Sequence, residues 1–418
     1  MKNIETLVYL DLDGITHLVG RLWARVRGNN ENATFEYDRS WLQHPLRFSL
    51  EPALSLDPGP FHTPGNTPLF GAIGDSAPDR WGRTLMRRME RRHAQKENRT
   101  PHTLAEINYL LLVDDEVRQG ALRFAEKDGG PFLREKGDER IPPVVELPRL
   151  LTASEHFLEE KDTDEDLRLL FAPGSSLGGA RPKASVKDKD GLLAIAKFPR
   201  KDDEFNVVIW EAVALALAKK AKVTVPDARI ERVANKSILL LRRFDRNGDH
   251  RIPFLSAMSM LGARDHETRS YLEIADALRQ YGANPTGDLE ALWQRIVFNI
   301  LVSNTDDHLR NHGFLLEGSA GWLLSPVYDV NPVPTDVKPR ILSTTINEDD
   351  GTASLSLAME VASYFGLNAT RARAIIAETG RAVSSWRKEA VSHGLGQADT
   401  DRMASAFEHE DLRLACEM

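Results

Sequence analysis

The chain has 418 residues, of which 41% are apolar and 28% are charged, and its net charge is −8 at neutral pH. This composition is typical of a soluble globular protein with two or three domains or one large bilobal one. It argues against a nucleic-acid binder that relies on bulk positive charge. No window approaches the roughly 18 apolar residues of a membrane span, and acids within the first apolar run argue against a signal peptide.

The single cysteine, Cys416, excludes an intramolecular disulfide. Together with the absence of targeting signals, it predicts a reducing, cytoplasmic location and no membrane partner.

Residues 1–40 alternate between apolar and polar side chains, with turns at Asp13-Gly14 and at 28–30. This pattern predicts a small antiparallel sheet. The next segment, "GDSAPDRWGRTLMRRMERRHAQKE", predicts a helix announced by Ser76 and Pro78. Its arginines could form a surface for nucleic acid or an acidic partner, or a solvated helix face: Arg80, Arg83, Arg87, Arg88, Arg91 and Arg92.

Gly, Pro and charged residues dominate 126–145, which predicts a linker. A polar helix is expected over about 146–170, then a glycine loop, two strands, a helix and two more strands. After Asn247-Gly248 the pattern becomes mainly helical. We therefore predict an α+β fold with domains 1–145 and 146–418, the second sheet-rich to about 247 and helical over 248–418.

The glycine loop "GSSLGGARPKASV" spans 174–186. Gly178 and Gly179 would let the backbone approach a phosphate closely, although glycine loops also close ordinary hairpins. Lys197, in "LLAIAKFP", is either an exposed strand lysine or a residue that neutralises nucleotide phosphates. Glu211, in the following helix, is either solvent-facing or paired with a buried cation such as Lys197.

The densest polar cluster is "NTDDHLRNHGFLL" at 304–316, between an apolar helix and a hairpin expected to turn at Gly318 and Gly321. Asp306 and Asn311 have the D-x-x-x-x-N spacing of a protein-kinase catalytic loop. In that chemistry the aspartate accepts the hydroxyl proton and the asparagine binds a metal ion. Asp329, at the end of the hairpin, stands where a second metal-holding acid would be expected.

Five segments, "SSLGGARPK", "AIAKFP", "RRFDR", "NTDDHLRNHGF" and "YDVNP", together closely resemble the HipA serine/threonine kinases, toxins of bacterial type II toxin–antitoxin pairs. The resemblance extends to "GDSAPDRWGRTLMRR" near the amino terminus. It implies a bilobal protein-kinase-like fold, ATP and Mg²⁺ as cofactors, and a small helix-turn-helix antitoxin that binds operator DNA. It also implies a protein substrate, such as an aminoacyl-tRNA synthetase or another translation component.

By position, Asp306 resembles the catalytic base, Asn311 and Asp329 resemble magnesium ligands, and Lys197 resembles the phosphate-binding lysine. The phosphate-binding loop corresponds to Leu177, Gly178, Gly179, Ala180, Arg181, Pro182 and Lys183. The adenine-contacting hinge corresponds to Arg242, Arg243 and Phe244, with Arg242 where some members carry an acid. Tyr328 is assigned to the nucleotide site, and His308 could orient the loop, touch phosphate or be structural.

Ser176 resembles the serine that such kinases phosphorylate on themselves, which pulls the phosphate loop out of the site. The adjacent Ser175 leaves the register open by one residue. Three alternatives to a protein kinase remain: a metal-dependent phosphodiesterase using Asp306, Asp307, His308 and Asp329, a non-catalytic co-repressor scaffold on an antitoxin–operator complex, and a small-molecule kinase.

Overall fold

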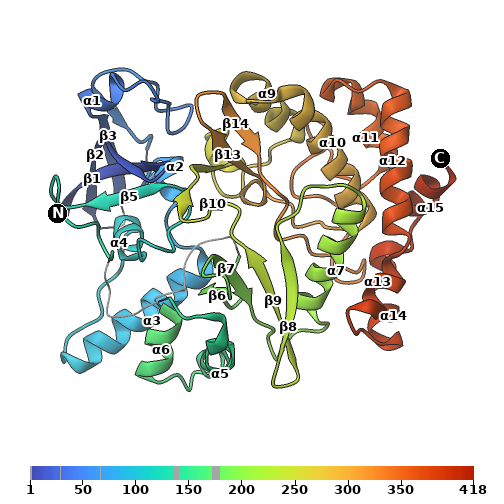
Figure 1. Cartoon of the computed structure of the whole chain (residues 1–418), viewed down its shortest axis with the longest axis horizontal. Coiled ribbons are helices and arrows are strands. Elements are labelled where there is room, and N and C mark those ends of the chain that lie inside the picture. Colours follow the sequence, from blue (N-terminus) through green and yellow to red (C-terminus); the bar gives the residue numbers. More distant parts are fainter. Residues whose placement is uncertain (1, 29, 66, 136–140, 172–178) are drawn as a thin grey trace. The chain divides into compact units, whose positions relative to one another are not determined.

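The computed structural model describes residues 2–28, 30–65, 67–135, 141–171 and 179–418 (Figure 1). Internal packing divides the chain into two compact units. The first unit comprises 1–200 and 242–255, and the second comprises 201–241 and 256–418. The domain boundary at residue 145 stays a prediction.

The first unit contains an antiparallel five-stranded sheet in the order β4-β3-β2-β1-β5 (Figure 1). Its strands are β1 (Lys2–Leu12), β2 (Ile15–Arg27), β3 (Asn30–Tyr37), β4 (Pro60–His62) and β5 (Leu122–Ala125). The predicted turn between β1 and β2 is present, with Asp13 and Gly14 both at positive φ (52° and 79°). Val8, Leu22 and Phe35 are fully buried in the core of this unit.

The helices of the first unit are α1 (Arg39–Leu42), α2 (Gly71–Asp75), α3 (Arg80–Lys96), α4 (Glu106–Leu112), η1 (Val144–Glu146), α5 (Leu147–Leu158) and α6 (Asp164–Phe171). The arginine-rich helix α3 begins at Arg80 and not at Ser76, because the Asp79 side chain caps it by accepting a hydrogen bond from the Gly82 amide (2.8 Å). The single helix predicted over 146–170 is wrong. Glu160, with φ of 57°, interrupts the helical backbone between α5 and α6.

Two short hairpins complete the first unit: β6 (Lys183–Lys187) with β7 (Leu193–Lys197), and β10 (Arg246–Asn247) with β11 (His250–Arg251). The described part of the predicted linker is packed onto the sheet. Phe132 lies edge-on to Tyr9, with ring centroids 5.4 Å apart, and the Arg123 guanidinium lies 3.6 Å from the centre of the Phe132 ring. These contacts give residues 126–135 a structural role that their composition did not predict.

The second unit carries the hairpin of β8 (Ala228–Val233) and β9 (Lys236–Arg242), the hairpin of β13 (Gly313–Glu317) and β14 (Gly321–Leu324), and most of the helices. The short strand β12 (Phe254–Ser256) leads into it. Its helices are α7 (Val207–Lys220), α8 (Ala257–Met260), α9 (Tyr271–Tyr281), α10 (Pro285–Leu301), η2 (Leu309–Asn311), α11 (Leu355–Val361), η3 (Ala362–Phe365), α12 (Ala369–Val383), α13 (Trp386–Ser392), α14 (Gln397–Phe407) and α15 (Glu410–Glu417). The helical character predicted after residue 248 is confirmed (Figure 1).

Helix α10 and the β13–β14 hairpin flank the polar segment at 302–312. Leu292, Ile296 and Ile300 are fully buried, as their spacing along one helix face predicts. The hairpin turns at Gly318 and Gly321, both at positive φ, which only glycine adopts at little cost. Among the described residues, no helix is both long and apolar enough to cross a membrane.

Candidate active site

The segment 302–312, called the catalytic loop below, is fixed to the second unit by its own buried side chains. Ser303 donates a hydrogen bond to the Ala406 carbonyl (2.7 Å). The Asn304 amide donates to Asn299 on α10 (3.0 Å) and accepts from the Asn331 backbone (3.1 Å). A loop held at this many points has few alternative conformations, which suits a site that must position reacting groups.

Asp306 lies at the surface of this loop, with its side chain 63% exposed. The Lys338 ammonium lies 3.9 Å from the Asp306 carboxylate and donates a hydrogen bond to the Thr305 carbonyl (3.0 Å). Sequence reasoning missed Lys338, which comes 32 positions after Asp306 and belongs to no motif. The exposed carboxylate is open to a substrate hydroxyl, and a cation stands beside it.

Asn311 is held in an orientation that suits a metal ligand. Its amide nitrogen donates to the Asp306 carbonyl (2.8 Å), while its amide oxygen Oδ1 is buried without a hydrogen-bond partner in the described part of the chain. A buried acceptor without a partner is costly unless a water or an ion satisfies it. An amide oxygen is a suitable ligand for Mg²⁺.

The segment that contains Asp329 lies against the catalytic loop. The Tyr328 hydroxyl donates to the Arg310 carbonyl (2.7 Å), and the Val333 amide donates to the Ser303 carbonyl (3.2 Å). Asp329 is half-buried and has a φ of 54°, a left-handed conformation that aspartate adopts more readily than most residues. The structure therefore brings the two segments of the predicted metal ligands together, while the ligand roles themselves stay predictions.

A buried polar network lies behind the exposed aspartate. Asp307 is fully buried, and its carboxylate accepts hydrogen bonds from the Tyr271 hydroxyl and from the Ser343 amide (2.7 Å). The buried His312 ring lies 3.0 Å from the Asp307 carbonyl oxygen. Burial raises the pKa of Asp307 to about 6 and lowers that of His312 to about 3. His308, half-buried at the start of η2, has its ring nitrogen Nδ1 unpartnered within the described residues, and its role stays open.

The predicted phosphate loop belongs to the first unit and is described only from Gly179 onward. Ser175, Ser176, Leu177 and Gly178 lie outside the described residues. Gly179 has a φ of 96°, and Ala180 is exposed. Arg181 is half-buried, and the Pro182 carbonyl accepts a hydrogen bond from the Phe198 amide (3.0 Å). The loop therefore leads directly into the β6–β7 hairpin, as predicted.

Lys197, predicted to neutralise nucleotide phosphates, and Glu211, predicted as a partner for a buried cation, are both buried. Lys197 is the last residue of β7 in the first unit, and Glu211 lies in the first half of α7 in the second unit. The solvent-exposed alternatives for these two residues are wrong. A buried charge is retained only with partners of opposite charge or strong hydrogen bonds, so both positions are candidates for function.

The "RRFDR" motif is anchored mainly by its charged side chains. Arg243 is fully buried and forms a two-pronged ion pair with Asp245, and it also donates to the Val117 carbonyl (2.8 Å). Arg242 pairs with Asp190. Phe244, half-buried, faces Phe254 at 6.4 Å between ring centroids. A hinge contact to adenine at Arg243 would therefore come from its backbone, because the guanidinium is already engaged.

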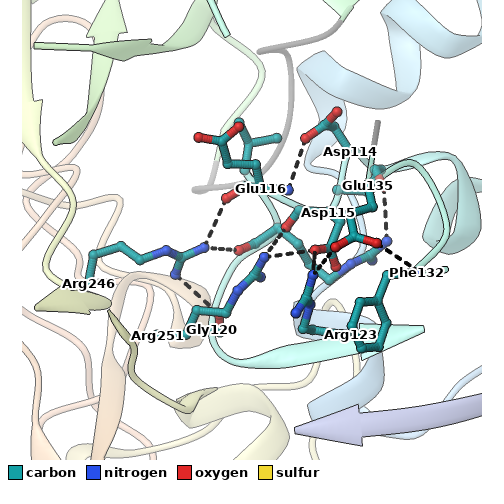
Figure 2. Close-up of polar contacts among 12 residues, drawn as sticks. Asp114, Asp115, Glu116, Gly120, Arg123, Phe132, Glu135, Arg246 and Arg251 are labelled. Carbon is teal, nitrogen blue, oxygen red and sulfur yellow. Dashed lines mark hydrogen bonds and ion pairs between the residues drawn. The ribbon is translucent and has the colours of Figure 1, made fainter. Parts of the chain in front are cut away.

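Figure 2 shows how Arg246, the last residue of this motif, and Arg251 reach the segment 114–123. Arg246 donates to the carbonyls of Glu116 and Gly120, and Arg251 donates to Asp115, which also binds Arg123 (Figure 2). Burial lowers the pKa of Arg246 to about 9. This ionic cluster ties the predicted hinge to the amino-terminal part of the same unit.

The arginines of α3 divide into two groups. Arg83 pairs with Glu106, and both Arg88 and Arg92 lie within ion-pair distance of the buried Asp162. The exposed members are Arg80, Arg87 and Arg91. Half of the predicted cationic surface is thus used to hold the helix to its neighbours, and the other half forms one exposed stripe.

Comparison with known proteins shows the family to which the chain belongs. Residues 175–386 match the HipA-like C-terminal domain family. The chain belongs to this family. The match covers every residue predicted for the catalytic loop, the metal ligands, the phosphate loop and the hinge. The predicted HipA resemblance is therefore confirmed.

The rest of the chain shares the HipA fold as well. A solved Shewanella oneidensis MR-1 HipA, in a complex with HipB and operator DNA, superposes with a TM-score of 0.68 over 99% of this chain and 96% of that one, at 18% identity. The predicted α+β fold of the HipA type is thus confirmed.

Two curated relatives are similar in sequence. A Haemophilus influenzae protein named "Putative kinase" is 23% identical over 49% of this chain and 69% of its own. A Sinorhizobium fredii protein named "Putative kinase Y4mE" is 25% identical over 71% of each chain.

Proposed function

We propose that this HipA-like protein is an ATP- and magnesium-dependent serine/threonine protein kinase. The observation that carries the proposal is the pairing on one loop of an exposed Asp306 with an Asn311 whose amide oxygen is buried and unpartnered. Kinase chemistry requires these two groups at this spacing, one to accept a proton and one to hold a metal ion. The names of the two curated relatives support the same class of reaction.

In the proposed reaction, a serine or threonine hydroxyl oxygen bonds to the γ-phosphorus of ATP, and the bond from that phosphorus to the β–γ bridging oxygen breaks. ADP leaves, and the hydroxyl proton passes to Asp306. Asn311 and Asp329 would hold Mg²⁺, which neutralises charge on the phosphates when bound. Lys197 would neutralise charge on the phosphates, and Lys338 would keep the Asp306 carboxylate in place.

We further propose that the chain phosphorylates a cellular protein, with a component of translation as the favoured class, and its own Ser176 or Ser175. It would then act in the cytoplasm as a growth-arresting toxin. The Shewanella oneidensis HipA was solved with HipB and operator DNA. By analogy, we infer a small helix-turn-helix antitoxin as the partner of this chain, with operator DNA bound through it.

The phosphodiesterase alternative loses one of its four proposed ligands. Asp307 is fully buried, and its two carboxylate oxygens are engaged by Tyr271 and Ser343. A non-catalytic scaffold needs no nucleotide, so the scaffold alternative predicts no phosphorylation by this chain. The kinase is favoured because the proposed base and both proposed metal ligands, Asp306, Asn311 and Asp329, are residue types that are competent for phosphoryl transfer.

Quantitative phosphoproteomics tests the proposal and would identify the substrate. Cells expressing the wild type are compared with cells expressing Asp306→Asn, with Asp265→Asn as a matched surface control that removes only the exposed pair with Arg310. The proposal predicts new phosphoserine or phosphothreonine sites with the wild type and the control, and none with Asp306→Asn. Identical phosphoproteomes for wild type and Asp306→Asn would contradict it.

A further inference from the structure

The point where the predicted phosphate loop becomes strand β6 is held by the amino-terminal end of α3, within the first unit. Asp79, which caps α3, also binds the Lys183 ammonium at 2.9 Å. Both side chains are only 6% exposed. The Trp81 indole, one residue inside the helix, donates to the Lys183 carbonyl (2.9 Å). Lys183 is thus held through both its side chain and its backbone.

The other side of this junction is also fixed. Lys183 lies directly opposite Lys197 in the β6–β7 register, and the Phe198 amide donates to the Pro182 carbonyl (3.0 Å). Directly opposed residues of an antiparallel pair project from the same face, where two like charges are unfavourable. The carboxylate of Asp79 offsets this repulsion at Lys183. Removing it would disturb both the strand end and the approach of the loop to the phosphates.

We infer that Asp79 and Trp81 form a latch that positions the phosphate loop, an inference that rests on the proposed kinase function. Asp79 and Trp81 are positioning residues: they act on nucleotide through the placement of Pro182 and Lys183. The motif "PDRWG" at 78–82 thereby gains a function, because one aspartate simultaneously starts α3 and fixes the exit of the loop. In this arrangement, Lys183 serves as the anchor of the loop.

The latch and a direct phosphate role for Lys183 predict different effects of Asp79→Asn on nucleotide binding. Asp79→Asn keeps an oxygen that can cap α3 but removes the charge that holds Lys183. If Asp79 is a latch, Mg–ATP should bind about tenfold more weakly, because a loop displaced by a fraction of an ångström loses aligned contacts. If Asp79 merely occupies a phosphate-binding lysine, the substitution should leave binding unchanged or make it tighter.

The test is isothermal calorimetry of the full chain with Mg²⁺ and the non-hydrolysable analogue AMP-PNP. Glu106→Gln is the matched control, since it breaks another ion pair of the same helix, with Arg83, away from the loop. The latch predicts weaker binding for Asp79→Asn and wild-type binding for Glu106→Gln. Wild-type or tighter binding by Asp79→Asn, or equal weakening by the control, would overturn it.

A second variant tests the latch if Asp79→Asn does not fold, because removing one charge of a buried ion pair is strongly destabilising. Trp81→Phe keeps both charges and removes only the indole donor to the Lys183 carbonyl. We expect roughly threefold weaker binding, as for the loss of one hydrogen bond, and unchanged binding would reject the latch. A wild type that binds no nucleotide would reject the proposed function and the latch together, whereas equal binding by wild type and variants rejects the latch alone.

Discussion

Replacing Asp307 by asparagine should change how the stability of the protein depends on pH. Burial raises the pKa of Asp307 from 3.8 to about 6 in the folded state, despite hydrogen bonds from Tyr271 and Ser343. Between these two values the folded chain binds a proton that the unfolded chain has released. Stability from this residue is therefore greatest at low pH and is lost as the pH rises through about 6.

The size of the effect follows from the two pKa values. A shift of one unit corresponds to about 1.4 kcal/mol, so the full loss is about 3 kcal/mol, of which about 2 kcal/mol falls between pH 4.5 and 7.5. Asp307→Asn cannot titrate and escapes this loss. The free energy of unfolding of the wild type minus that of the variant should therefore decrease by about 2 kcal/mol over this range.

Urea unfolding at several pH values, followed by circular dichroism, measures this difference. Taking the difference between wild type and variant cancels the contributions of other titrating groups to the free energy of unfolding. One such group is the buried His312, whose pKa is lowered in the folded state and which therefore destabilises the protein as the pH falls. Asp306→Asn serves as the control, because it makes the same substitution at the neighbouring aspartate, which is exposed and lies outside the buried network. A difference between wild type and Asp307→Asn that stays constant with pH would show that the pKa of Asp307 is not raised in the folded protein.

Three further predictions concern nucleotide and phosphate. Lys197→Ala should weaken Mg–ATP binding by about 1–3 kcal/mol in calorimetry, and unchanged affinity would remove Lys197 from the site. Lys338→Met should lower kcat about tenfold with little change in the KM for ATP, because the lost cation stands beside Asp306; an unchanged kcat would limit Lys338 to anchoring the loop. Ser176→Ala, or Ser175→Ala if the register differs, should abolish self-phosphorylation but keep the affinity for ATP. Ser176→Asp should lower the affinity for ATP. Peptide mapping and calorimetry check both outcomes, and full ATP affinity in the phosphorylated wild type would contradict the switch.

The sequence predicted those features that depend on local patterns. Apolar residues at helical spacing marked the buried face of α10, and paired glycines marked the β13–β14 turn, because periodicity directly reports which side of an element is buried. The D-x-x-x-x-N spacing placed Asp306 and Asn311 on one loop. Such signals require only neighbours in the chain.

Contacts between distant residues could not be predicted in this way. The Asp79–Lys183 pair joins residues 104 positions apart, and Asp307 finds its partners 36 positions away in both directions. No local sequence pattern predicts which buried charged residues will form a pair. The spacing to Asn311 set Asp306 apart from the adjacent Asp307, but it did not predict that Asp307 is fully buried while Asp306 is exposed. Tertiary packing alone makes that distinction.

Transfer of phosphate in a purified system tests the kinase assignment most directly. The wild type, Asp306→Ala and Asp329→Ala are each incubated with ATP, with magnesium or with a chelator, and analysed by intact-mass spectrometry and phosphopeptide mapping. Melting curves establish that each variant is folded. The proposed kinase activity predicts phosphate on serine in the wild type with magnesium only, and none in either variant. Undiminished transfer by a folded Asp306→Ala, or no transfer by the wild type, would contradict it.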